Sequence, residues 1–145
     1  SVETSFIEAG IAAITVELGV PRLYQQDMIT RGIQGSQNVL AHYKVIDKKI
    51  EDTAESRKAY IGNEMTSIGA KTGGFADILV NIGDDVKKGQ KVAVQRNAFG
   101  DVVAEYTSDK DGKVLAIGTD VTREPRALLV RILSINPAES CSKGC

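Results

Sequence analysis

The segment from Ile11 to Leu18 constrains the fold more than any other part of the chain. It reads Ile-Ala-Ala-Ile-Thr-Val-Glu-Leu, so it is nearly continuous in apolar residues, is rich in β-branched ones and is closed by Gly19. Such a run predicts a strand with both faces buried, which belongs inside a parallel sheet covered on both sides. One strand cannot make a sheet, and the later strands have another pattern, so its partners are expected outside this chain.

Helical patterns flank this strand. Residues 2–9 predict the end of a helix, with Gly10 in the usual stop position. A second helix is predicted from Asp27, because apolar residues fall on one helical face, although Gly32 and Gly35 weaken its middle. These apolar residues are Ile29, Ile33, Leu40 and Tyr43. Residues 1–46 are therefore predicted to be the C-terminal end of a larger α/β domain.

The rest of the chain has a different composition. Residues 47–59 carry mixed charges and are predicted to be a linker, residues 60–135 to be an all-β domain, and residues 136–145 to be a polar tail. The pentapeptide Ile-Gly-Asp-Asp-Val at 82–86 recurs as Ile-Gly-Thr-Asp-Val at 117–121, which indicates a pseudo-twofold β sandwich or small barrel. The predicted strands are Phe75–Val80, Lys91–Gln95, Val102–Tyr106, Lys113–Ile117 and Ala127–Leu133.

Charge and hydropathy exclude several classes of protein. The 145 residues include 18 basic and 19 acidic side chains, and this balance argues against a nucleic-acid binder or a polybasic membrane-surface protein. No apolar run approaches the ~20 residues that span a bilayer, and no signal segment begins the sequence. We therefore expect no nucleic acid and no membrane as partners, and a cytoplasmic location.

Few side chains in this sequence could bind a metal. Cys141 and Cys145 lie in the last five residues, where we interpret them as part of the polar tail, with a two-thiolate metal clip as the alternative. His42 is the only histidine. A catalytic zinc commonly takes three protein ligands, two of them histidines, so no catalytic metal site is expected within this chain.

Two stretches of the β part resemble biotinyl and lipoyl domains, which are flattened barrels of the barrel-sandwich type. Residues 83–92 (Gly-Asp-Asp-Val-Lys-Lys-Gly-Gln-Lys-Val) resemble the turn and strand of one half, and residues 111–114 resemble the matching turn of the other. Carrier domains of this kind place a modifiable lysine at a hairpin tip between the halves. Residues 95–101 contain no lysine, so a lipoyl or biotin carrier lacks its attachment point.

A broader resemblance covers residues ~5 to ~133. Residues 10–19, 31–33 and 38–40 are similar to the closing part of the catalytic domain of the succinylglutamate desuccinylase/aspartoacylase family, and residues 73–75 and 99–103 resemble turns of its β domain. The family consists of zinc-dependent hydrolases related to metallocarboxypeptidases. The resemblance implies a hydrolase that removes the acyl group from a small N-acylated amino acid, with this chain as its C-terminal portion.

Glu17 is the candidate catalytic residue. It is the only charge in its predicted strand and lies at the carboxyl end, the edge at which open α/β sheets bind ligands. Partial burial there would suit a carboxylate to proton transfer near neutral pH. The resemblance implies that Glu17 takes a proton from zinc-bound water and passes it to the leaving amine. A solvated strand-end glutamate is the alternative.

The remaining site residues and partners follow from the resemblance. It implies zinc ligands from a His-x-x-Glu pair and a later histidine. No His-x-x-Glu occurs here, so these ligands are expected upstream of residue 1, with the absence of a catalytic metal as the alternative. Arg22 is a candidate for binding the substrate carboxylate, with a surface arginine as the alternative. The expected partners are the missing N-terminal catalytic segment, a small N-acyl amino acid and a second copy in a homo-oligomer. Arg96, Arg123, Arg126 and Arg131 receive no role.

The main alternative function is a non-enzymatic binding or adaptor module built on a lipoyl-like β fold. Glu17 and the apolar strand that contains it count against this alternative, because such a module does not need a fragment of parallel sheet.

Overall fold

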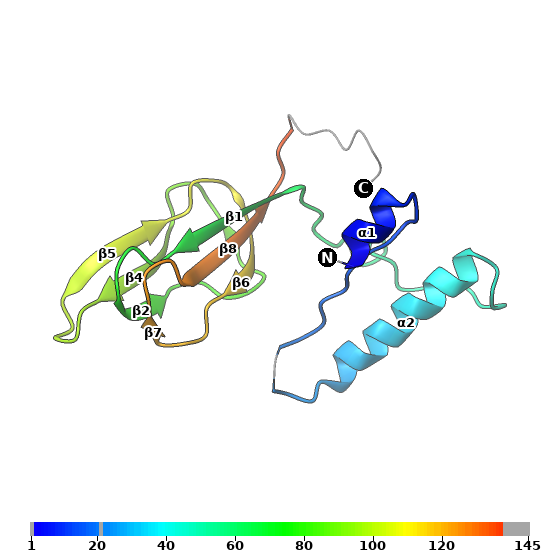
Figure 1. Ribbon diagram of the computed structural model, residues 1–145, viewed down its shortest axis with the longest axis horizontal. Helices are drawn as coiled ribbons and strands as arrows, with labels where there is room; N and C mark the ends of the chain where they lie inside the picture. Colours follow the sequence, from blue (N-terminus) through cyan, green and yellow to red (C-terminus); the bar gives the residue numbers. More distant parts are fainter. Residues whose placement is uncertain (1, 21, 138–145) are drawn as a thin grey trace. The chain divides into compact units, whose positions relative to one another are not determined.

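The computed structural model describes residues 2–20 and 22–137 (Figure 1). The chain divides into two compact units, Ser1–Ala59 and Tyr60–Cys145. Cys141 and Cys145, and with them the predicted metal clip, lie outside the described residues. No helix among the described residues is both long enough and apolar enough to cross a membrane.

The first unit contains the two predicted helices, α1 (Val2–Glu8) and α2 (Gln26–His42). Gly10 has a φ of +77°, a conformation that side chains rarely adopt, so it ends α1 as the sequence predicts. The second helix begins one residue before Asp27 and continues through Gly32 and Gly35. The glycines therefore do not interrupt this helix.

The apolar segment 11–18 forms no strand, because no described segment pairs with it. Its large apolar side chains stay open to solvent: Ile14 is 78% exposed and Val16 is 61% exposed. None of the described residues up to Ala59 is buried. The first unit therefore has no hydrophobic core within the described residues.

Residues 47–59, predicted to be a linker, are fastened to α2. The Asn38 side chain donates a hydrogen bond to the Glu51 carbonyl and accepts one from the Glu51 N–H at 3.2 Å. Asp52 and Arg57 form a two-pronged ion pair within this segment. These contacts explain why the segment groups with the first unit.

The second unit consists of two four-stranded antiparallel sheets. One sheet has the order β1-β8-β6-β3 and the other the order β5-β4-β2-β7. The strands are β1 (Glu64–Gly69), β2 (Gly74–Ile78), β3 (Asp85–Val86), β4 (Lys91–Arg96), β5 (Val102–Thr107), β6 (Gly112–Ile117), β7 (Thr122–Arg123) and β8 (Leu128–Ser134). The two sheets do not join into a closed barrel, so the predicted lipoyl-like barrel is not confirmed.

The strand order has an internal symmetry. Replacing β2, β3, β4 and β5 by β6, β7, β8 and β1, and the reverse, converts the order of one sheet into the order of the other. The short strand β3 pairs with β6, which belongs to the other half of the chain, and β7 likewise pairs with β2. The pseudo-twofold arrangement predicted from the pentapeptide repeat is therefore present as a sandwich.

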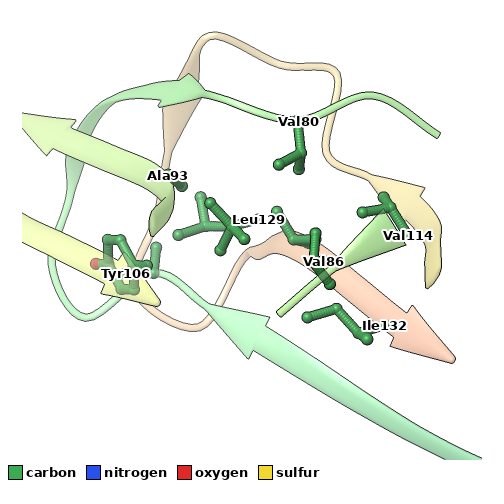
Figure 2. Close-up of a cluster of buried hydrophobic side chains, with 10 residues drawn as sticks. Val80, Val86, Ala93, Tyr106, Val114, Leu129 and Ile132 are labelled. Carbon is green, nitrogen blue, oxygen red and sulfur yellow. The ribbon is translucent and has the colours of Figure 1, made fainter. Parts of the chain in front are cut away.

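The core lies between the two sheets (Figure 2). Leu129 and Ile132 of β8 are 0% exposed, as is Val92 of β4. Side chains from both sheets and from the segments beside them complete the buried cluster: Ala70, Val80, Val86, Ala93, Tyr106, Val114 and Val130. Burial of this apolar surface is the main stabilising contribution to the second unit.

Limited proteolysis should expose the difference between the units. We expect a protease of broad specificity to cut first within residues 2–59, where no described residue is buried, and to leave a resistant fragment close to 60–137. Mass spectrometry of early digestion products measures this directly. First cuts between Phe75 and Leu133 would contradict the assignment of the stable core to the second unit.

Candidate active site

Glu17 lies between two apolar residues of segment 11–18, and its side chain is exposed. No described residue forms a hydrogen bond or ion pair with its carboxylate. The partial burial predicted for this carboxylate is therefore not supplied by the described residues. They leave it free to meet a substrate or another part of a longer protein.

The turn that follows Glu17 is held in a defined conformation. Gly19 has a φ of +71°, and a Cβ at this position would collide with the side-chain oxygen of Gln25. That same oxygen, Oε1, accepts a hydrogen bond of 2.7 Å from the Val20 N–H. The Gln25 side chain thus links the turn after Glu17 to the residue that precedes α2. Sequence reasoning missed Gln25, because a hydrogen bond that its side chain accepts from this turn has no sequence signature.

A small residue in α2 lets the helix approach the segment that carries Glu17. A Cβ at Gly32 would lie 2.8 Å from Leu18 Cδ1, which is closer than real side chains come. One helical turn further on, Gly35 has no atom within 4 Å of the corresponding position. Gly32 is therefore a contact point of α2 with Leu18, the neighbour of Glu17. The sequence signal was present, since Gly32 is unfavourable within a helix unless packing requires it.

A largely apolar hollow of about 770 Å³ lies in the first unit beside this contact. Ile14, Val16 and Leu18 form one wall of the hollow. The middle and C-terminal half of α2 and residues 52–59 supply the others. Glu17 is not among the lining residues. The apolar side chains at alternate positions of the segment therefore line the hollow, and the Glu17 carboxylate lies outside its lining.

Two of the charged side chains that line the hollow, Asp52 and Arg57, are paired with each other. Arg57 forms a hydrogen bond with Asp52 and lowers the pKa of the Asp52 carboxyl, and the nearby positive charge of Arg31 adds to this effect. Asp52 therefore stays ionised and bound to its arginine near neutral pH. It is a structural partner of Arg57 and not an available base.

Arg22, the candidate for the substrate carboxylate, follows the Gly19 turn and is exposed, with a φ of +65°. Among the described residues it forms no ion pair, with Glu17 or with any other carboxylate. The structure thus leaves the Arg22 guanidinium accessible but does not join it to Glu17.

The described residues do not fit a catalytic zinc. His42 ends α2, is exposed, and packs edge-on against the Tyr43 ring at 5.1 Å. Across residues 2–20 and 22–137, no three histidine, cysteine, aspartate or glutamate side chains gather as metal ligands would. Glu17 is therefore without a metal centre formed by the described part of the chain.

Comparison with solved structures identifies proteins of the same fold. The ectoine utilization protein EutE (DoeB) from Ruegeria pomeroyi is 17% identical, with a TM-score of 0.74 over 92% of this chain. A succinylglutamate desuccinylase/aspartoacylase from Rhodobacter sphaeroides is 19% identical, with a TM-score of 0.76 over 94% of this chain. A succinylglutamate desuccinylase from Silicibacter sp. TM1040 is 18% identical, with a TM-score of 0.67 over 90%.

This chain spans only 41 to 44% of the length of these three proteins. No family model matches the sequence, and no curated protein does. At identities below 20%, the likeness establishes the fold. It confirms, at that level, the resemblance carried by residues ~5 to ~133: the chain has the fold of part of the proteins of the succinylglutamate desuccinylase/aspartoacylase family.

Proposed function

We propose that this chain is the C-terminal part of a zinc-dependent hydrolase that removes the acyl group from a small N-acylated amino acid. The observation that carries the proposal is the fold likeness, which extends over both units and includes proteins described as succinylglutamate desuccinylases. The zinc ligands are proposed to lie upstream of residue 1, because the described residues form no such site.

In this proposal Glu17 moves the proton that amide hydrolysis requires. A water molecule that attacks an amide must lose a proton, and the departing amine must gain one. An exposed carboxylate on a fixed turn can accept the first proton and deliver it to the nitrogen. Gly19 and Gln25 hold the turn after Glu17, so they are proposed to position this carboxylate.

Arg22 is proposed to bind the carboxylate of the substrate. Its guanidinium is accessible, it has no carboxylate partner among the described residues, and it follows Glu17 by five residues. A planar guanidinium can hold a carboxylate through two parallel hydrogen bonds. Arg22 would then hold the carboxylate of the substrate while Glu17 transfers the proton at the amide bond.

The activity itself can be tested with a longer protein that contains this chain and the sequence before it. We expect such a protein to hydrolyse at least one member of a panel of N-acetyl and N-succinyl amino acids, with the free amine measured as product. Loss of activity after chelation and its return with zinc would support the metal. A well-folded, zinc-loaded longer protein that hydrolyses none of the panel would contradict the proposal.

The 145-residue chain alone is expected to bind no stoichiometric zinc at a catalytic site and to hydrolyse none of these substrates. The measurement is elemental analysis of the purified chain with Cys141→Ser and Cys145→Ser, which removes the thiolates of the tail. One tightly held zinc per chain in this variant would show that the ligands are not upstream.

A further inference from the structure

Arg123 occupies a position that the other half of the sandwich gives to a core valine. Arg123 of β7 lies opposite Gly74 of β2, and Val86 of β3 lies opposite Gly112 of β6. The symmetry of the strand order therefore makes Arg123 the counterpart of Val86, which is 1% exposed. The side chain of Arg123 is itself only 5% exposed. A cation is thus buried where an apolar side chain serves in the other half.

The chain makes room for this guanidinium. A Cβ at Gly118 would lie 2.6 Å from Nη2 and 2.9 Å from Cζ of Arg123, and it would also collide with the Leu128 carbonyl oxygen. The glycine at 118 therefore accommodates the arginine.

The hydrogen-bonding capacity of Arg123 is not met within the chain. Its ion pair joins Nη1 to Asp120 Oδ2 at 3.6 Å, and the Asp120 side chain is 87% exposed. The Nε of Arg123 is buried and has no hydrogen-bond partner. Within residues 2–20 and 22–137, it is the one buried side-chain nitrogen or oxygen in this state. Burying a charged group with an unmet donor is costly, so such a group calls for an explanation.

A neighbouring buried polar side chain shows the contrast. Gln95 is 0% exposed and is the counterpart of Ile132 in the other half. Its Nε2 donates to the Thr72 carbonyl, and its Oε1 accepts a hydrogen bond from the Tyr106 hydroxyl. The same region of the sandwich therefore gives both polar atoms of the Gln95 side chain a partner and leaves the Arg123 Nε without one.

We propose that Arg123 is the anchor of a carboxylate-binding site. The guanidinium presents parallel N–H groups that match the two oxygens of a carboxylate, and Asp120 reaches only Nη1. The ligand is either a free small carboxylic acid or an aspartate or glutamate side chain from a part of a longer protein outside this chain. It approaches through the exposed residues Thr119 and Asp120. This inference does not depend on the proposed hydrolase activity.

The test follows the arginine Nε–H signals of the 145-residue chain by NMR while formate replaces chloride at constant ionic strength. We expect the Arg123 signal to shift and to saturate. Arg123→Met identifies the signal by its loss, and Arg123→Lys does so if the methionine variant does not fold. The matched control Lys88→Met removes an exposed charge from the same unit and should leave the formate response unchanged.

The absence of a shift, or a shift that grows linearly without saturation, would overturn the site, because Arg123 would then be satisfied by water or by nothing. Repeating the titration on a longer protein distinguishes the two sources of the carboxylate. A retained response identifies a free acid as the ligand. A response present in the 145-residue chain but lost in the longer protein identifies a side chain that already fills the site.

Discussion

Glu17→Gln is expected to lower kcat by roughly two to four orders of magnitude in a longer protein that hydrolyses an N-acyl amino acid, since positioned proton transfer contributes typically ~10²–10⁴-fold. Glutamine keeps the size and hydrogen-bonding reach of glutamate but cannot accept the proton. An amine that departs without a proton is a very poor leaving group. Steady-state kinetics on an accepted substrate measures the effect.

The division between kcat and KM identifies the kind of interaction that is lost. KM should change far less than kcat, because proton transfer belongs to the transition state and not to substrate binding. Glu55→Gln is the matched control: it removes an exposed glutamate from the same unit and should leave kcat near that of the wild type. A Glu17→Gln protein that keeps its zinc and turns over within a few-fold of wild type would remove Glu17 from the mechanism.

Leu129→Ala is expected to lower the free energy of unfolding of the second unit by about 2–5 kcal/mol. Leu129 is 0% exposed and lies between the two sheets, close to Val86, Ala93 and Tyr106 (Figure 2). Truncation removes its apolar contacts and leaves a cavity that strands from both sheets cannot easily close. Urea unfolding of the 145-residue chain, followed by near-ultraviolet circular dichroism, to which the buried Tyr106 contributes, measures the loss.

Leu115→Ala is the control for this experiment, since it removes the same atoms from a strand position that is 43% exposed. It should cost less than about 1 kcal/mol, because little apolar surface is lost from the core. Equal losses for the two variants would show that the region between the sheets is not the principal core.

The long strands of the second unit could be predicted because alternation and turn residues mark them locally. Each of the five predicted strands corresponds to an observed one within two residues at either end. The strands β3 and β7 were missed because two residues carry no periodicity and are defined only by the partner strand. The strand β1 was missed because its sequence is largely polar, and it is recognisable only through its pairing with β8.

The candidate site likewise has parts that the sequence could indicate and parts that only the folded structure reveals. Glu17 could be selected as a candidate because it interrupts an apolar run, and its catalytic role stays a prediction. The partial burial expected of its carboxylate is not supplied by the described residues, which leave it exposed. The Gln25 hydrogen bond and the packing of Gly32 against Leu18 depend on how the chain folds back after residue 19. Arg123, which received no role from the sequence, stands out only when its position is compared with that of Val86.

The exchange of β3 and β7 between the two halves makes each half depend on the other. Neither half could complete its own sheet, because each lacks a short strand that the other provides. Two separate copies of one half would have to swap these strands, which is the geometry of a domain-swapped homodimer. The second unit has the architecture of such a dimer, in which the connections from β1 to β2 and from β5 to β6 join the two halves and keep each at a high effective concentration near the other.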